Sequence, residues 1–274
     1  MVYILLPVHN RKKITLDFIK SLKKQTYEKI FLILIDDGST DGTADAVIDE
    51  YKNTHVIYGN GNLWWAGSLQ KGYEYLVNSA NVSENDHILI MNDDTSFNED
   101  YIKNGIKIIQ KNPQYLLGSV AISAQNGKVL DSGKKVNWRG YKIEDIANDE
   151  KVECLSTRGL FIPILSFVDI GGFHPYLLPH YLSDYEYTIR AVNKGYKLMS
   201  DKSLFLYQNE ETTGIHSINE MNYDIISKLR LIFSKKYAQN PFYISTFILL
   251  CCPLKYRLQN ILRIWARVFK QLIG

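Results

Sequence analysis

The first 120 residues alternate short apolar runs with longer segments in which apolar residues recur at the spacing of a helix. Four strands are predicted, over residues 2–6, 29–35, 55–58 and 87–91. The helices are predicted over residues 10–25, 43–52, 65–79 and 100–111. Runs that are apolar on both faces are typical of parallel strands with helices on either side. The alternation therefore predicts an α/β fold with a Rossmann-like, mostly parallel sheet flanked by helices.

Polar residues directly follow each predicted strand. The four clusters are Pro7-Val8-His9-Asn10, Asp36-Asp37, Gly59-Asn60-Gly61-Asn62 and Asn92-Asp93-Asp94. Parallel strands bring their carboxyl ends to one edge of a sheet, and ligands of such sheets bind beyond that edge. We therefore expect the clusters to converge on a single site.

Asp93 and Asp94 place two like charges side by side at the end of an apolar run. A divalent cation would offset their repulsion. Mg²⁺ and Mn²⁺ prefer oxygen ligands, often one or two carboxylates together with substrate phosphates. The alternative is a solvated turn, because Asn and Asp are common turn residues. Both interpretations stay open on these residues alone.

The stretch DDGSTDGT at residues 36–43 also has two interpretations. It can be a turn into a helix, with Asp41 or Thr40 as the cap. It also suits a nucleotide site, in which Asp36 or Asp37 accepts hydrogen bonds from a nucleobase or ribose. Glycine and serine would then allow the backbone to come close to the ligand.

The pattern changes after residue 120. A hairpin is predicted over residues 123–137, with its turn at Asn126-Gly127. A helix is predicted over residues 182–194, and Gly195 would end it.

The segment 225–274 is distinct in charge, because it holds nine Lys or Arg residues and no Asp or Glu, in a chain of net charge +3. Its apolar positions 258, 261, 262, 265, 268, 269 and 272 predict a basic amphipathic helical tail. Such a helix suits an anionic membrane surface. The alternative is a helix packed on the rest of the chain or on a second subunit in a homodimer.

Three cysteines, at positions 154, 251 and 252, show no metal-ligand spacing and no apt disulfide pairing, which favours a reducing cytoplasm. The apolar N-terminus lacks the basic start of a signal peptide. The apolar stretch 242–254 is short for a membrane span. We expect a cytoplasmic protein, peripheral on the inner face of the cell membrane, with no nucleic-acid partner.

Five motifs occur together in order: PVHNR at 7–11, IDDGSTDGT at 35–43, MNDD at 91–94, GGF at 171–173 and SDYEYTIRA at 183–191. The set resembles the family 2 inverting glycosyltransferases of GT-A fold, over about the first 220 residues. GNGNLWWAG at 59–67 resembles the rhamnosyltransferase-like subgroup of bacterial surface polysaccharide assembly. The resemblance implies a GT-A domain over 1–224. Residues 1–120 would bind the nucleotide sugar, and 121–224 would provide the acceptor and catalytic part.

By this resemblance, the nucleobase and ribose of a UDP- or dTDP-sugar are held by Pro7, Val8, His9 and Asp37, with Asp36 nearby. These residues form the donor end of the expected site.

The resemblance also assigns the reacting end. Asp93 and Asp94 would form the D-x-D-like site for Mn²⁺ or Mg²⁺ and the diphosphate, with Asp94 ahead of Asp93 as direct ligand. His216 falls where many members place a histidine near the metal. Asp184 matches the catalytic base, which would deprotonate the attacking hydroxyl.

Two further residues are predicted to contact substrate. Trp64 and Trp65 are either core residues or a platform beside a sugar, and we predict Trp65 in the site. Glu186 lies two positions after Asp184, so it points in another direction on a helix. It is predicted to contact the acceptor, and a helix-surface position is the alternative.

Some positions depart from the family pattern. His9 replaces an aromatic residue, Gln70 replaces an asparagine, and Ser183 replaces an acidic residue. His180 is predicted to be a packed loop histidine, and a place in the wall of the acceptor cleft is the alternative. Arg158 is either a surface residue or a contact of the diphosphate or acceptor.

The residues and the resemblance together predict a metal-dependent enzyme. It would move a sugar from a nucleotide-diphosphate donor to a glycan or lipid-linked acceptor. A sugar nucleotidyltransferase is one alternative, although the basic stretch 10–13 lacks the glycines of a triphosphate loop. A non-catalytic glycan- or nucleotide-binding module is the other.

Overall fold

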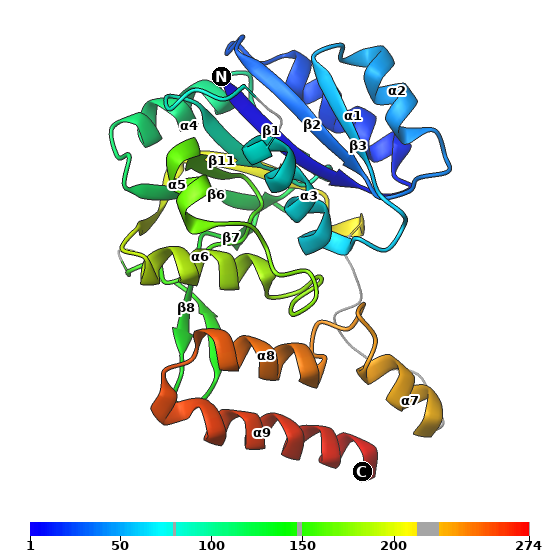
Figure 1. The fold of residues 1–274 in the computed structure, drawn as a ribbon, viewed down its shortest axis with the longest axis vertical. Coiled ribbons are helices and arrows are strands. Elements are labelled where there is room, and N and C mark those ends of the chain that lie inside the picture. The colour runs from blue at the N-terminus through cyan, green and yellow to red at the C-terminus, as the bar shows by residue number, and fades with distance from the viewer. Residues whose placement is uncertain (79–80, 147–149, 213–224, 274) are drawn as a thin grey trace.

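The computed structural model describes residues 1–78, 81–146, 150–212 and 225–273. Within them the chain builds one large sheet and one small one (Figure 1). The strands of the large sheet are β1 (Val2–Val8), β2 (Ile30–Asp36), β3 (Thr54–Tyr58), β4 (His87–Ile90), β5 (Thr95–Ser96), β6 (Tyr115–Ser123), β7 (Val129–Asp131), β10 (Leu160–Pro163) and β11 (Lys197–Gln208). The small sheet pairs β8 (Lys134–Asn137) with β9 (Lys142–Asp145).

The order across the large sheet is β3-β2-β1-β4-β10-β6-β11-β5, with β7 paired to β6. The first four strands in this order are parallel. Val8 pairs with Asp36, and Leu5 with Ile90, so the predicted polar clusters meet at one edge. The Rossmann-like, mostly parallel sheet is thus confirmed. β10 lies antiparallel between β4 and β6, which the sequence pattern did not predict.

Six helices cover the sheet: α1 (Lys12–Lys23), α2 (Thr43–Glu50), α3 (Trp64–Asn78), α4 (Tyr101–Gln110), α5 (Ile164–Ile170) and α6 (Ser183–Asn193). Alternate residues of β1 face opposite layers. Ile4 packs in the cluster that includes α1, α2 and α4, whereas Leu5 packs with α3, α5 and α6. This two-layer burial explains why the parallel strands are apolar throughout.

Two local predictions can be checked directly. β6 and β7 pair as a hairpin, and Gly127 in its turn has a positive φ of 73°. The N-cap prediction is wrong: Gly42, and neither Asp41 nor Thr40, is the N-cap residue of α2. Asp41 nevertheless accepts a hydrogen bond from the backbone N–H of Thr43 at 3.1 Å. Asp41 also accepts the backbone N–H of Lys12 at 3.0 Å, so it joins the starts of α1 and α2.

The C-terminal segment forms α7 (Ile225–Ile232), α8 (Pro241–Cys251) and α9 (Leu254–Ile273), after a short 3₁₀ turn at Glu210–Thr212. Figure 1 shows α8 and α9 at the end of the molecule opposite α2. Phe247 of α8 is fully buried and packs with Val136 and Ile189. Asn260 of α9 donates a hydrogen bond to the carbonyl of Trp138 at 2.6 Å. One side of this helical pair is therefore packed on the rest of the protein.

In the part of the chain that the structure describes, no helix combines the length and apolarity needed to cross a membrane.

Candidate active site

A pocket of about 790 Å³ lies at the carboxyl ends of β1, β2 and β4. Loops from both halves of the domain and from the segment after α7 line it. The sequence-predicted residues in its wall are Pro7, Val8, His9, Asp37, Trp65, Asp93, Asp94 and Asp184. These predicted residues, from Pro7 to Asp184, thus meet in one cavity although they are far apart in the chain.

Three predicted site residues are placed elsewhere or not described. Asp36 is buried beside the pocket and accepts the backbone N–H of Ser39 at 2.8 Å. Glu186 is buried and pairs with Arg190. His216 lies outside the described residues.

The carboxylate of Asp37 shapes the loop after β3. It accepts backbone N–H groups from Gly61 at 2.8 Å, Leu63 at 2.9 Å and Trp64 at 3.1 Å. His9 Nδ1 lies 2.6 Å from the Asp37 carbonyl oxygen. A carboxylate has about four acceptor positions, so these bonds leave Asp37 about one for a ligand.

Arg11 compensates the adjacent carboxylates at the end of β4. Its Nε donates to Asp93 Oδ2 at 2.9 Å, and its Nη2 lies 3.4 Å from Asp94 Oδ2. Thr15 also donates to Asp93, at 3.0 Å. Burial raises the pKa of Asp93, and Arg11 opposes that shift. The sequence analysis missed this role of Arg11, although the residue follows the strand that turned out to neighbour β4.

A divalent metal fits beside Asp93 and Asp94 only if a bound substrate supplies further oxygen ligands. Among the described residues, no group of three or more His, Cys, Asp or Glu side chains could hold a metal ion. Both carboxylates line the pocket; Asp93 accepts hydrogen bonds from Arg11 and Thr15, whereas Asp94 lies 3.4 Å from Arg11. Mg²⁺ and Mn²⁺ commonly bind through one or two carboxylates plus substrate phosphates. The residues present therefore suit a metal that arrives with a diphosphate.

Asp184 lies in the first turn of α6, directly after Leu182-Ser183. Burial raises the pKa of Asp184 to about 6, with Arg158 lowering it and the negative charge of Asp131 raising it. A carboxylate with a pKa close to neutral is suited to general-base catalysis. Asp131, at the end of β7, is a buried pocket residue that the sequence analysis did not single out.

The start of α6 is anchored by the turn at 171–173. Glu186 holds Arg190 through two contacts, at 2.8 and 3.1 Å. Arg190 in turn donates to the carbonyl oxygens of Ile170 at 2.7 Å and Gly172 at 2.8 Å. Gln70 accepts the backbone N–H of Phe173 at 2.8 Å. In this structure Glu186 therefore positions the helix that carries Asp184, and Gln70 orders the same turn.

Other residues of the pocket wall bear on the alternatives left open for Trp65 and Arg158. Trp65 lines the pocket, and its indole N–H donates to Thr157 at 3.1 Å. Arg158 also lines the pocket and is only partly exposed, so it is no simple surface arginine. Lys236 and Ala238, which follow α7, complete the wall from the C-terminal segment. None of these contacts was visible in local sequence patterns.

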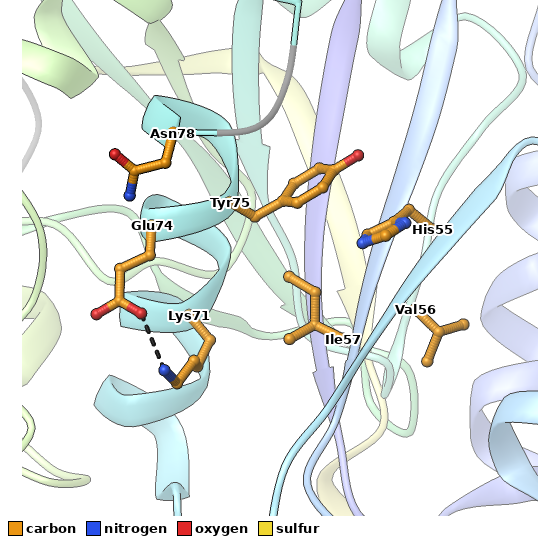
Figure 2. A pocket seen from close by; sticks show the side chains of 7 residues that line it. All are labelled: His55, Val56, Ile57, Lys71, Glu74, Tyr75 and Asn78. Carbon is orange, nitrogen blue, oxygen red and sulfur yellow. Dashed lines mark hydrogen bonds and ion pairs between the residues drawn. The ribbon is translucent and has the colours of Figure 1, made fainter.

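A second pocket, of about 400 Å³, lies between β3 and α3 (Figure 2). His55 stacks on Tyr75 with ring centroids 4.1 Å apart, and Lys71 pairs with Glu74 at 3.0 Å. No sequence-predicted site residue lines this pocket. It lacks the paired carboxylates that define the first.

The family model of glycosyl transferase family 2 matches residues 3–161, more than half of the chain. The protein therefore belongs to glycosyl transferase family 2, and its sheet and helices have the GT-A arrangement. A search of curated proteins finds no significant relative.

Solved structures with this fold include two glycosyltransferases. One is the mannosyltransferase PcManGT from Pyrobaculum calidifontis in complex with GDP-Man and Mn²⁺, with a TM-score of 0.58 and 12% identity. That match covers 97% of this chain and 68% of PcManGT. The other is GalNAc-T7 with UDP, GalNAc and Mn²⁺, with a TM-score of 0.64 and 13% identity. It covers 89% of this chain and 50% of GalNAc-T7. At such identities the likeness concerns the fold.

Proposed function

We propose that this protein is a metal-dependent inverting glycosyltransferase of the hexosyltransferase type. It transfers a sugar from a UDP- or dTDP-sugar to a hydroxyl of a glycan or lipid-linked acceptor, in bacterial polysaccharide or glycoconjugate synthesis. One observation carries the proposal. A single pocket joins Asp94, at a strand end suited to a metal diphosphate, with Asp184, whose pKa is raised to about 6.

The donor occupies the edge formed by β1, β2 and β4. Pro7, Val8 and His9 line the nucleoside part together with Asp37. The two solved relatives of the same fold were crystallised with a sugar nucleotide or its parts and Mn²⁺, which supports this class of donor. The likeness of GNGNLWWAG to the rhamnosyltransferase-like subgroup supports a 6-deoxyhexose donor as the first choice to test.

Asp94 would hold Mn²⁺ or Mg²⁺ beside the donor diphosphate, with Asp93 and His216 as further family positions. When bound, the ion supplies a Lewis acid for the charge that develops on the leaving phosphate. Arg11 contacts both carboxylates and would hold them in position when no donor is bound.

Asp184 takes the proton from the acceptor hydroxyl as that oxygen attacks the anomeric carbon. The bond to the leaving diphosphate breaks on the opposite side, and a single displacement inverts the anomeric configuration. Burial, with a smaller contribution from the negative charge of Asp131, keeps the pKa of Asp184 raised for this transfer, and Arg158 limits the shift.

The test is incubation of the protein with a panel of nucleotide sugars, Mn²⁺ and glycan acceptors. Release of nucleoside diphosphate, with a product of inverted configuration by NMR, is the expected result. Release of pyrophosphate from a sugar phosphate and a nucleoside triphosphate would instead identify a nucleotidyltransferase. Binding without turnover would indicate a non-catalytic module.

The C-terminal helices add a membrane contact to the proposal. Residues of the predicted apolar stripe of α9 differ in exposure: Val268 is buried, while Leu258, Leu262 and Phe269 remain 71%, 61% and 65% exposed. Ile264, outside the predicted stripe, is also buried. Lys255, Arg267 and Lys270 of the same helix are exposed basic residues. An apolar strip beside basic side chains suits a bilayer with anionic lipids. A lipid-linked acceptor would be reached from that surface.

A further inference from the structure

Trp64 and His180 meet at the wall of the active-site pocket. Their rings are arranged edge to face, with centroids 5.7 Å apart, and both residues line the cavity. Trp64 Nε1 and His180 Nδ1 are each buried without a hydrogen-bond partner among the described residues. Buried polar atoms are nearly always paired in proteins, so two neighbouring exceptions in a pocket call for a ligand.

The backbone around Trp64 is strained to hold the indole there. Trp64 has a positive φ of 59°, which is costly for a bulky residue. Asp37 maintains this conformation by accepting the backbone N–H groups of Leu63 and Trp64. Strained residues of this kind concentrate at functional sites.

Hydrogen bonds also join the loop of Trp64 to the loop that carries the base. Ala66 donates its backbone N–H to the Pro179 carbonyl at 3.0 Å. Ser183 Oγ donates to the carbonyl of His180 at 2.7 Å, and Asp184 is the next residue. These hydrogen bonds link the loops of Trp64 and His180 to Asp184, the proposed base that deprotonates the acceptor.

The chemistry of the pair suits an uncharged, hydroxyl-rich ligand. The indole N–H is a donor only, and a neutral imidazole offers one donor and one acceptor. Burial lowers the pKa of His180 to about 4, so the ring is neutral at pH 7. Lys235, in the C-terminal segment, places its ammonium group over the Trp64 ring, 5.8 Å from the indole centroid, as a cation–π contact.

We propose that Trp64 and His180 form the subsite for the pyranose ring of the acceptor. The ring hydroxyls pair with Trp64 Nε1 and His180 Nδ1, and the apolar C–H face of the sugar packs against the face of an aromatic ring. This assignment rests on the proposed function and deepens it, since it assigns acceptor recognition to Trp64 in place of Trp65, whose nitrogen is already bound to Thr157.

The test compares wild type with Trp64→Gly, Trp64→Phe and His180→Phe. Glycine suits the left-handed backbone, so Trp64→Gly removes the indole without adding strain. Phenylalanine keeps the aromatic packing and removes the polar nitrogen in each case. Tyr176→Ala is the matched control, because Tyr176 is an almost fully exposed aromatic of the loop that holds His180 and lines neither of the two pockets described above.

Binding of methyl pyranosides and disaccharides is measured by saturation-transfer NMR, and binding of UDP and dTDP by calorimetry. We expect saccharide affinity to fall about tenfold in Trp64→Gly and His180→Phe. Nucleotide affinity and the Tyr176→Ala control should stay within about twofold of wild type. Unchanged saccharide affinity in these variants, or no saccharide binding by wild type, would overturn the proposal. A parallel loss of nucleotide affinity would reassign the pair to the nucleobase.

Failure of the proposed function has a different signature. Wild type that binds saccharides through Trp64 but releases no nucleoside diphosphate from any donor refutes the transferase and leaves the subsite intact. Wild type that turns over donor while Trp64→Gly keeps its saccharide affinity and acceptor KM refutes the subsite alone.

Discussion

Asp184 and Asp94 are carboxylates of one pocket in two different environments. Burial and the charge of Asp131 raise the pKa of Asp184 to about 6, whereas Arg11 lies beside Asp94. A carboxylate with a pKa raised toward neutrality can act as a base near pH 7. These two environments should affect the pH dependence of the rate, the stability of the fold and the turnover of nucleotide sugar.

The first concerns pH. A base acts only when ionised, so kcat/KM should rise with pH through about 6 and level off above it. Asp131→Asn removes a negative charge that raises the pKa of Asp184, so the rising limb should move to lower pH. Steady-state rates over a pH series measure both effects. Asp17→Asn, an exposed carboxylate on α1, is the control, and an unmoved limb in Asp131→Asn would contradict this account.

The second prediction links activity to stability. The folded-state pKa of Asp184 is raised from 3.8 to about 6, so ionising this group costs folding free energy. The loss begins as the pH rises above the unfolded value and is complete above about 6. Asp184→Asn should therefore raise the free energy of unfolding at pH 7 by about 1–3 kcal/mol. Urea titrations at pH 7 and at pH 4 measure it. A gain of equal size at both pH values would show another cause.

At the scale of elements, the sequence predicted the parts of the fold that depend on local pattern. The alternation over the first 120 residues predicted β1 to β4 and α1 to α4, because each element shows its own periodicity. β10, β11 and β5 were missed. β10 pairs Leu160 with Ile90, and β11 pairs Gln208 with Thr95, so these strands depend on distant partners.

The site residues also divide into those that local sequence motifs predict and those that only the folded chain shows. The motifs around Asp94 and Asp184 are continuous in sequence, and both residues lie in the pocket. Arg11 and Asp131 act through side chains far along the chain, and no local pattern shows such a pairing. Glu186 shows the converse: its place in a motif predicted a substrate contact, while its carboxylate is buried against Arg190.

One element-scale prediction concerns the packing of α4 on the sheet. A methyl group at Gly105 would meet the ring of Phe161, which is fully buried in β10. Overpacking costs about 1–3 kcal/mol, more than the roughly 1 kcal/mol that alanine gains over glycine in a helix. Gly105→Ala should lower the free energy of unfolding by about 1–2 kcal/mol in thermal and urea denaturation. Gly140→Ala, where a methyl group meets open space, should be near neutral. Equal stability of the two variants would show that the core yields at Phe161.

At the scale of the whole molecule, the C-terminal segment connects the pocket to a surface. Lys236 and Ala238 line the candidate active-site pocket, and α8 and α9 follow them directly in the chain. Phe247 and Asn260 fasten this helical pair to the domain. Its outer strip, Leu258, Leu262 and Phe269, remains exposed. A bilayer bound to this strip would contact the end of the molecule opposite α2, where α8 and α9 lie (Figure 1). The strip would thus attach the part of the protein that holds the pocket to the membrane.

The corresponding prediction uses a triple variant, Leu258→Ser, Leu262→Ser and Phe269→Ser. Binding to vesicles that contain anionic phosphatidylglycerol should fall about tenfold or more, because the side chains that would enter the bilayer are lost. Cosedimentation measures it, with Tyr176→Ser as an exposed-aromatic control. Unchanged sedimentation would refute the membrane contact. A dimer in wild type that becomes a monomer in the triple variant would make the strip a subunit interface.

The central claim is that one pocket unites a metal-diphosphate position at Asp94 with a base at Asp184. Its most direct measurement is nucleoside diphosphate release from nucleotide sugar with Mn²⁺ and acceptor, for wild type, Asp94→Asn and Asp184→Asn. We predict turnover by wild type and loss of metal-dependent turnover in Asp94→Asn. Asp184→Asn should be slower by about 10²–10⁴-fold, with UDP or dTDP affinity retained. Full activity in Asp184→Asn, or nucleotide affinity lost together with its activity, would contradict the assignment of Asp184 as the base.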